Sequence, residues 1–322
     1  MKALDLRTRV GRVELVSPVL TASGTSGHGS ELARYMDLSA LGAVTVKSLS
    51  AGPWDGNPSP RLHPVAAGML NSVGLENPGM ATWLAVDLPA LAATGAKVVA
   101  SIWGFTVADY RQVAAILADA VVEAGHRSGP ARSIVAVEAN ISCPNIEDRR
   151  HMFAHCQASA AAAVEAIADG LGSCGLPLWA KLSPNVTDLP AIAGAVLDAG
   201  ADALTLVNTL MGLALDPVTG RAVLGAGGGG LSGPALHPVA VRAVFECRRA
   251  RPEVPIVGVG GVTTGADAAE LLAAGADAVS VGTATFSDPR APERVSRELA
   301  TWCRRHHVRH IRDLVGRAHG DH

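Results

Sequence analysis

The sequence has few cysteines, and none is spaced as metal or redox sites require. Its five cysteines stand at positions 143, 156, 174, 247 and 303 of 322 residues, and no CxxC occurs. An odd, scattered set of this kind argues against a disulfide framework. It also argues against an iron–sulfur cluster or a zinc site held by this chain alone.

Long apolar runs and an excess of one charge are also missing. No segment approaches 18 uninterrupted apolar residues, and residues 1–16 alternate charged and apolar side chains instead of forming the apolar core of a signal peptide. The formal net charge is −2, without a long basic run. We therefore expect a cytoplasmic protein with neither a membrane nor a nucleic-acid partner.

Aromatic residues make up only 3% of the chain, whereas hydrophobic residues reach 48% and glycine alone accounts for 35 positions. This apolar content is enough for a sizeable core in one large domain. Small residues let helices pack closely on strands and let the connecting loops turn tightly.

Eight short apolar runs alternate with helical patterns. The expected strands are Pro18–Thr21, Ala43–Lys47, Lys97–Ile102, Ile134–Asn140, Pro177–Lys181, Ala203–Val207, Ile256–Gly258 and Ala278–Val281. The helical patterns include Val107–Ala124, Ala158–Gly170, Leu189–Ala199, Pro238–Ala250, Ala266–Ala274 and Pro292–Arg305. This alternation is typical of a parallel (β/α)8 TIM barrel, which we expect to span residues 1–322 as a single domain.

One phrase occurs twice, as Ala-Gly-Ala-Asp-Ala at residues 199–203 and again at residues 274–278. Each copy follows a helical pattern and leads into an expected strand. Gly200 and Gly275 are therefore predicted to end their helices, in the helix-to-strand turn of a barrel.

Three stretches are expected to form long loops, near residues 48–76, 141–156 and 208–234. Long ordered loops of a barrel usually belong to the face where the strands end, which carries the active site. Residues 228–233 fit GxGxxG by spelling alone, with no acidic residue placed for a ribose. We interpret them as a flexible loop and not as a dinucleotide site.

Polar residues stand where the expected strands end. Lys47 and Lys181 each end an apolar strand, and a buried lysine is costly unless it meets an anion. A single lysine could equally reach solvent at the rim. Two of them, beside Asn140 and Asn208, favour an anionic ligand or a charge that develops during a reaction.

Glycines end the last two expected strands, as Gly260-Gly261 and Gly282-Thr283. The loops after strands seven and eight form the usual phosphate site of a barrel, because glycine lets backbone N–H groups approach the anion. The alternative, that these glycines only make tight turns, does not explain why they fall on both expected strands.

Cys143 lies in Asn140-Ile141-Ser142-Cys143-Pro144-Asn145, a polar loop directly after the fourth expected strand. A thiol with a pKa near ~8.5 can accept a proton close to neutrality, more readily if a cation lowers that pKa. Cys174, Cys247 and Cys303 have no such surroundings and fit the role of small core residues. Cys156 begins a helical pattern, where a lone cysteine is usually incidental.

With these motifs the sequence resembles the class 1 dihydroorotate dehydrogenases over almost its whole length, from Ser17 to Gly316. The most specific matches are TASGT (21–25), VKS (46–48), GNP (56–58), LNSVGLENPG (70–79), NISCPN (140–145), KLSPNVTD (181–188), NT (208–209), GLSGP (230–234) and VGTA (281–284). Residues 206–215 look most like class 1B, which passes electrons to NAD through a partner subunit.

The resemblance implies an FMN enzyme that oxidises (S)-dihydroorotate to orotate in de novo pyrimidine biosynthesis. FMN would be held by Ser23, Lys47, Ser48, Ser101, Asn140, Lys181, Val207, Gly233, Gly260, Gly261, Gly282 and Thr283. The substrate would be held by Lys47, Asn71, Ser72, Val73, Gly74, Leu75, Asn140, Asn145, Asn208 and Thr209. Cys143 would be the general base, taking the proton from C5 while C6 delivers hydride to flavin N5.

The resemblance also implies a partner subunit carrying FAD and a 2Fe–2S cluster, which agrees with the lack of a cysteine cluster here. We further expect a homodimer. Three features depart from the family pattern: Trp103 brings a bulky indole near the flavin loop, residues 146–156 diverge in the lid region, and His237 replaces a usual lysine.

Three alternatives remain open from the residues alone. The first is a related FMN barrel acting on another dihydropyrimidine or cyclic amide. The second is a flavin-binding subunit without turnover, against which Cys143 argues. The third is an aldolase-like lyase with Lys181 as a Schiff-base lysine, which would leave residues 140–145 and 71–79 without a purpose.

Overall fold

Eight parallel strands form a barrel in the computed structural model, which describes residues 4–127, 129–142 and 152–320. In chain order they are β3 (Val19–Thr21), β4 (Val44–Thr45), β7 (Val98–Ile102), β8 (Ile134–Asn140), β9 (Leu178–Leu182), β10 (Ala203–Leu206), β13 (Ile256–Val259) and β14 (Ala278–Val281). Each coincides with one expected strand to within a few residues. The predicted (β/α)8 TIM barrel is therefore confirmed.

The hydrogen-bonded order of the strands is β3-β14-β13-β10-β9-β8-β7-β4, so β3 and β4 are the first and last strands of the row. Gly42 N donates to Val19 O at 2.8 Å and Thr21 N donates to Ala43 O at 3.2 Å. The Thr21 hydroxyl accepts from Thr45 N at 2.9 Å. These bonds join the two ends of the row.

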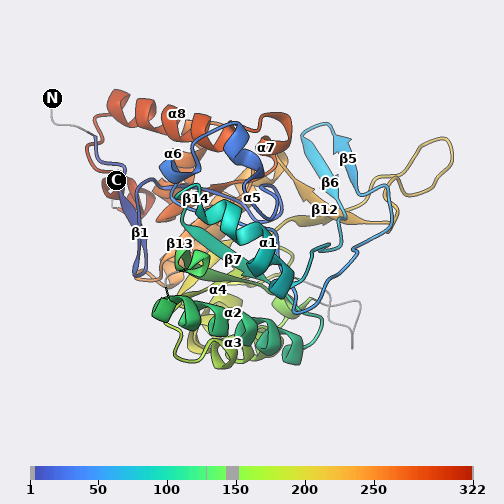
Figure 1. Ribbon diagram of the computed structural model, residues 1–322. Coiled ribbons are helices and arrows are strands. Elements are labelled where there is room, and N and C mark those ends of the chain that lie inside the picture. Colours follow the sequence, from blue (N-terminus) through green and yellow to red (C-terminus); the bar gives the residue numbers. More distant parts are fainter. Residues whose placement is uncertain (1–3, 128, 143–151, 321–322) are drawn as a thin grey trace.

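Helices surround the barrel (Figure 1). They are α1 (Met80–Ala92), α2 (Val107–Arg127), α3 (Gln157–Leu171), α4 (Leu189–Asp198), α5 (His237–Ala250), α6 (Gly265–Ala274), the short α7 (Ala284–Ser287) and α8 (Ala291–Arg305). Two 3-10 turns, Glu31–Arg34 and Leu38–Ala40, stand between β3 and β4 in place of a helix. No helix in the described part of the chain is both long and apolar enough to cross a membrane.

Alternation along the strands produces two separate cores. Val98, Ala100 and Ile102 of β7 belong to the cluster packed against the helices, whereas Val99 belongs to the cluster inside the barrel. Successive strand residues point to opposite faces, so one apolar run serves both cores. Inward positions near the strand ends are polar instead, beginning with Ser101.

The repeated phrase builds the same turn twice, as predicted. Gly200 and Gly275 adopt φ values of +106° and +122°, which end α4 and α6. The following aspartate then binds the start of the preceding barrel strand. Asp202 accepts from Leu178 N and Asp277 accepts from Ile256 N, both at 2.8 Å.

The two ends of the barrel are covered differently. At the amino-terminal end, a hairpin of β1 (Thr8–Val10) and β2 (Val13–Leu15) packs its apolar side chains into the interior core. A four-stranded antiparallel sheet of β5 (Leu62–Val65), β6 (Gly68–Asn71), β11 (Leu210–Gly212) and β12 (Gly229–Ser232) forms from segments that follow barrel strands. Figure 1 shows β5, β6 and β12 on the far side of the barrel from β1.

This sheet corrects one prediction. The glycine-rich residues 228–233, expected to be a flexible loop, contain strand β12, paired with both β6 and β11. A Cβ at Gly230 would collide with the Thr209 side chain, and one at Gly229 with the Asn71 backbone. The glycines therefore permit close backbone approach within a sheet. The stretches near 48–76 and 208–234, expected to be long loops, therefore also contain the strands β5, β6, β11 and β12.

Candidate active site

A cavity of about 540 Å³ lies between the carboxyl ends of the barrel strands and the four-stranded sheet. Its lining contains these residues singled out from the sequence: Ser23, Lys47, Ser48, Asn71, Ser72, Val73, Gly74, Leu75, Asn140, Lys181, Val207, Asn208, Thr209, Gly233, Gly260, Gly261, Gly282 and Thr283. Ser101 is fully buried outside this lining. Cys143 and Asn145 lie outside the described residues. The chain thus brings residues 260 positions apart around one space.

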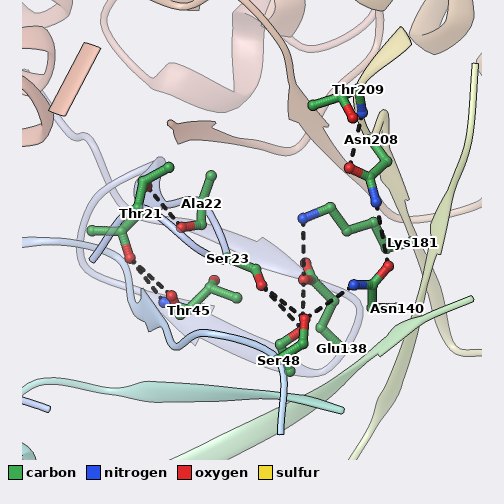
Figure 2. A network of polar contacts seen from close by, with 12 residues as sticks. Thr21, Ala22, Ser23, Thr45, Ser48, Glu138, Asn140, Lys181, Asn208 and Thr209 are labelled. Carbon is green, nitrogen blue, oxygen red and sulfur yellow. Dashed lines mark hydrogen bonds and ion pairs between the residues drawn. The ribbon is translucent and has the colours of Figure 1, made fainter. Parts of the chain in front are cut away.

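Three serines form a closed set of hydrogen bonds at one side of the cavity, and two of them, Ser23 and Ser48, are labelled in Figure 2. Ser23 Oγ lies 3.2 Å from Ser48 Oγ and 3.3 Å from Ser101 Oγ, and Ser48 Oγ lies 3.0 Å from Ser101 Oγ. Ser23 and Ser48 face the cavity, whereas Ser101 lies behind them. Ser101 can therefore act on a ligand only through the other two.

Lys181 forms an ion pair with Glu138, a residue that sequence reasoning missed. Lys181 Nζ lies 3.4 Å from Glu138 Oε1, and only 7% and 4% of the two side chains is exposed. Ser101 Oγ donates to the same oxygen at 3.2 Å. A signal was present, because Glu138 is a carboxylate inside the apolar run of β8, two residues before Asn140 and therefore on the same inward face.

Amides continue the polar wall from β8 to β10. Asn140 Nδ2 donates to Ser48 Oγ at 3.1 Å, and Asn208 Nδ2 donates to Asn140 Oδ1 at 3.3 Å. Asn208 Oδ1 in turn accepts from Thr209 N at 2.8 Å. These bonds fix the orientation of two amide side chains before any ligand arrives, which reduces the ordering cost of binding.

Lys47 is the second cation of the cavity, and its backbone N–H donates to Gly27 O at 3.0 Å. The neighbouring His28 is kept neutral more readily than a free histidine, because burial, and then the Lys47 charge, lower its pKa. The positive charge on this side of the cavity therefore belongs to Lys47. Lys47, which follows β4, and Lys181 of β9 share the cavity as the anionic-ligand hypothesis requires.

Glycine turns form another part of the wall. Gly260 and Gly261 have φ values of +143° and +66°, and the amides of Gly260, Gly261, Gly282 and Thr283 donate to no other group within the described ranges. Such amides are suited to a phosphate. His237, where the resemblance led us to expect lysine, supports this turn, with Nδ1 2.9 Å from Gly260 O and Nε2 3.1 Å from Glu270.

Apolar groups line the cavity where the loops and the sheet cover it. Trp54 and Phe105 pack edge to face with centroids 4.9 Å apart, and Trp54 Nε1 donates to Gly74 O at 2.9 Å. Trp103 lies behind them, 4.6 Å from the Phe105 ring and fully buried. Its indole therefore acts through Phe105. No periodic pattern points to Trp54 or Phe105, because both lie outside helices and strands.

The other cysteines lie away from the cavity lining. Cys247 and Cys303 are fully buried, and burial raises the pKa of Cys247 to about 12 and also raises that of Cys303. Cys156 is exposed at the start of α3, where hydrogen bonds from the Ser159 and then the Ala158 backbone lower its pKa. The buried pair fits the predicted role of core residues, and Cys174 is partly buried.

Comparison with known proteins points to one family. The family model described as dihydroorotate dehydrogenase matches residues 5–302. A protein of Solibacter usitatus (strain Ellin6076), named as a candidate dihydroorotate dehydrogenase A (fumarate), is 45% identical over 312 residues, 97% of this chain and 98% of its own. Two further relatives are named as dihydroorotate dehydrogenase B (NAD(+)), catalytic subunit. The one from Geobacter sp. (strain M21) is 40% identical over 316 residues, which cover 98% of this chain and 99% of its own. The one from Pelobacter propionicus (strain DSM 2379 / NBRC 103807 / OttBd1) is 41% identical over 312 residues, which cover 97% of this chain and 98% of its own.

Proposed function

Because the chain belongs to the dihydroorotate dehydrogenase family, we propose that it oxidises (S)-dihydroorotate to orotate in de novo pyrimidine biosynthesis. The observation that carries the proposal is a single cavity holding two lysines, a row of oriented amides and two glycine turns. A planar, carboxylated ring and a phosphorylated cofactor need this combination of groups.

The family depends on a flavin, and the flavin proposed for this chain is FMN. One phosphate can meet the free amides at Gly260-Gly261 and Gly282-Thr283, and the GxGxxG-like residues 228–233 are occupied in strand pairing. Ser23, Ser48 and Lys181 would hold the flavin ring. When bound, the flavin accepts the two electrons that the substrate gives up.

The substrate would lie between the flavin and the sheet. Lys47 offers a cation for its carboxylate, and Asn71 lines the same cavity from β6, its own Nδ2 donating to Gly230 O at 3.1 Å. Asn140 and Asn208 present oriented amides for the ring's carbonyl and N–H groups. The pairing of a lysine with several amides favours dihydroorotate over an uncharged dihydropyrimidine.

The chemistry needs one base. The thiolate of Cys143 would take the proton from C5 of the substrate, and a bound flavin would supply the acceptor, at N5, for the hydride that leaves C6, so that the C5–C6 double bond of orotate would form. Cys143 lies outside the described residues, so its role rests on its place in the polar sequence segment 140–145. Lys181 would balance the negative charge that the hydride brings.

Replacement of Cys143 tests this function. Cys143→Ala should retain FMN and bind orotate, yet its flavin should be reduced by dihydroorotate at least ~100-fold more slowly, because general-base catalysis contributes ~10²–10⁴-fold. Anaerobic stopped-flow reduction measures the rate. Cys156→Ala is the matched control and should behave as the parent. A rate for Cys143→Ala within a few-fold of the parent would remove this thiol from the mechanism, and a colourless parent that takes up no FMN would refute the function.

The electron acceptor is proposed to be NAD, reached through a partner subunit that carries FAD and a 2Fe–2S cluster. The relatives differ here, since the Solibacter name gives fumarate and the Geobacter and Pelobacter names give NAD(+). Residues 206–215 and the absence of CxxC in this chain favour the second. The homodimer and the cytoplasmic location stay predictions.

A further inference from the structure

We propose that Glu138 is a positioning residue that lowers the reduction potential of the flavin, by offsetting the positive charge of Lys181. This inference rests on the flavin site proposed above. Glu138 is outside the cavity lining, and so it acts through Lys181 and not by touching the ligand.

The position of Glu138 is fixed from two sides. Its Oε1 accepts from Lys181 Nζ at 3.4 Å and from Ser101 Oγ at 3.2 Å. Lys181 lines the cavity, and Ser101 is bonded to Ser23 and Ser48, which also line it. Figure 2 shows Lys181 joined to the Glu138 carboxylate, with Ser23 and Ser48 nearby. One residue, Lys181, therefore separates the carboxylate from the cavity along the first route, and two serines separate it along the second.

The surroundings of the carboxylate make its charge effective. Glu138 is 3% exposed, and the residue paired with it on β9 is the fully buried Trp179, which belongs to the apolar interior core. Charges interact more strongly in such an interior than in water, because little solvent screens them. A negative charge held one residue behind the cavity wall is thus felt at the flavin.

The consequence follows from charge balance. The pair Lys181–Glu138 carries no net charge, so the cavity wall offers less positive potential than a lone lysine would. Accepting a hydride makes the flavin more negative, and a lone cation would hold that reduced form more tightly. Glu138 limits this effect, which leaves the electrons available to the next acceptor.

Three variants of the flavin-loaded protein test the proposal. Glu138→Gln keeps the shape and an acceptor oxygen but removes the charge, and should stabilise reduced over oxidised flavin about tenfold, a shift of about +30 mV for a two-electron couple. Glu138→Asp keeps the charge but withdraws it by one methylene, and should shift the potential the same way by less. Glu165→Gln, on an exposed position of α3, should leave it unchanged. Equilibration with reference dyes gives the potentials.

The proposal is supported if the parent has the lowest reduction potential, Glu138→Asp an intermediate one and Glu138→Gln the highest. Equal potentials, a negative shift, or a larger shift for Asp than for Gln overturns it, since a structural role would follow shape and not charge. If the Gln variant does not fold, the sign of the Asp shift decides alone. A protein that takes up no flavin refutes the proposed function, whereas a loaded protein whose potential ignores position 138 refutes this inference only.

Discussion

The two ends of the barrel interior are built from the same strands but filled with different side chains. On β7 the inward residues run from Val99 to Ser101, and on β9 from Trp179 to Lys181. The amino-terminal half is apolar and closed by the β1–β2 hairpin, whereas the carboxyl half is hydrogen bonded and faces the cavity. A step of two residues along a strand thus separates side chains that stabilise the fold from side chains that serve the site.

This comparison predicts that the two halves respond differently to substitution. In the polar half, stability and ligand binding should be separable, because removing both members of a polar pair can restore the free energy of unfolding without restoring ligand binding. In the apolar half, stability should fall while the properties of the site survive.

The largest effect is expected at Lys181. Lys181→Met leaves the Glu138 charge buried without its partner, and breaking a buried pair in this way costs ~3–5 kcal/mol in the free energy of unfolding. Adding Glu138→Gln should restore most of that stability, because neither charge then remains buried. Both proteins should lose flavin affinity. Denaturant unfolding of the flavin-free proteins, with FMN titration alongside, measures the two quantities.

A double variant as unstable as the single one would show that the Lys181 side chain stabilises the barrel by packing and not as a charge partner. A double variant that still binds FMN as the parent does would remove Lys181 from the flavin site.

Local pattern was enough to predict the barrel. Val98–Ile102 is buried on both faces, and a short continuous apolar run is what such a strand requires. The same reasoning found Lys47 and Lys181, because charge at a strand end is visible in the chain itself. The same signal was present at Glu138, a carboxylate inside the apolar run of β8, but its pairing with Lys181 joins two strands 43 residues apart and could not be predicted from the local pattern.

The four-stranded sheet could not be predicted locally. Residues 69–71 pair with residues 230–232, so the strand character of the glycine-rich segment depends on a partner about half the chain away. A run of glycines is permissive by itself, and only the pairing decides its conformation. The geometry around Trp54, Phe105 and Trp103 has the same origin, since ring contacts join separate loops.

A smaller effect is expected in the apolar half. Leu20 of β3 is fully buried in the interior core, and Leu20→Ala should cost ~2–5 kcal/mol through lost burial and the space left behind. The folded protein should keep its flavin reduction potential and its affinity for orotate. Unfolding and potentiometry on the same preparation compare the two halves. A shifted potential would mean that the apolar half also positions the site, which would break the distinction.

The smallest effect concerns the repeated turns at the amino-terminal end, where Asp202 and Asp277 make the same hydrogen bond to a strand amide. Burial, opposed by the Ile256 amide and by Arg248, raises the pKa of Asp277 above 3.8. The folded state therefore holds its proton more tightly than the unfolded chain. The contribution of Asp277 to stability is largest below pH 3.8 and declines as pH rises through the raised pKa.

Asp277→Asn removes this titration while keeping an oxygen for the Ile256 amide, so we expect a loss below ~1.5 kcal/mol that is smaller at about pH 7 than at about pH 4. Asp202→Asn is the matched control in the same turn, and urea unfolding of both variants and the parent at the two pH values measures the difference. A loss for Asp277→Asn that grows toward neutral pH would show that its ion pair with Arg248, 2.8 Å long, outweighs the burial of the carboxylate. In either case the flavin site should be unaffected, because this turn lies at the opposite end of the strands from the cavity.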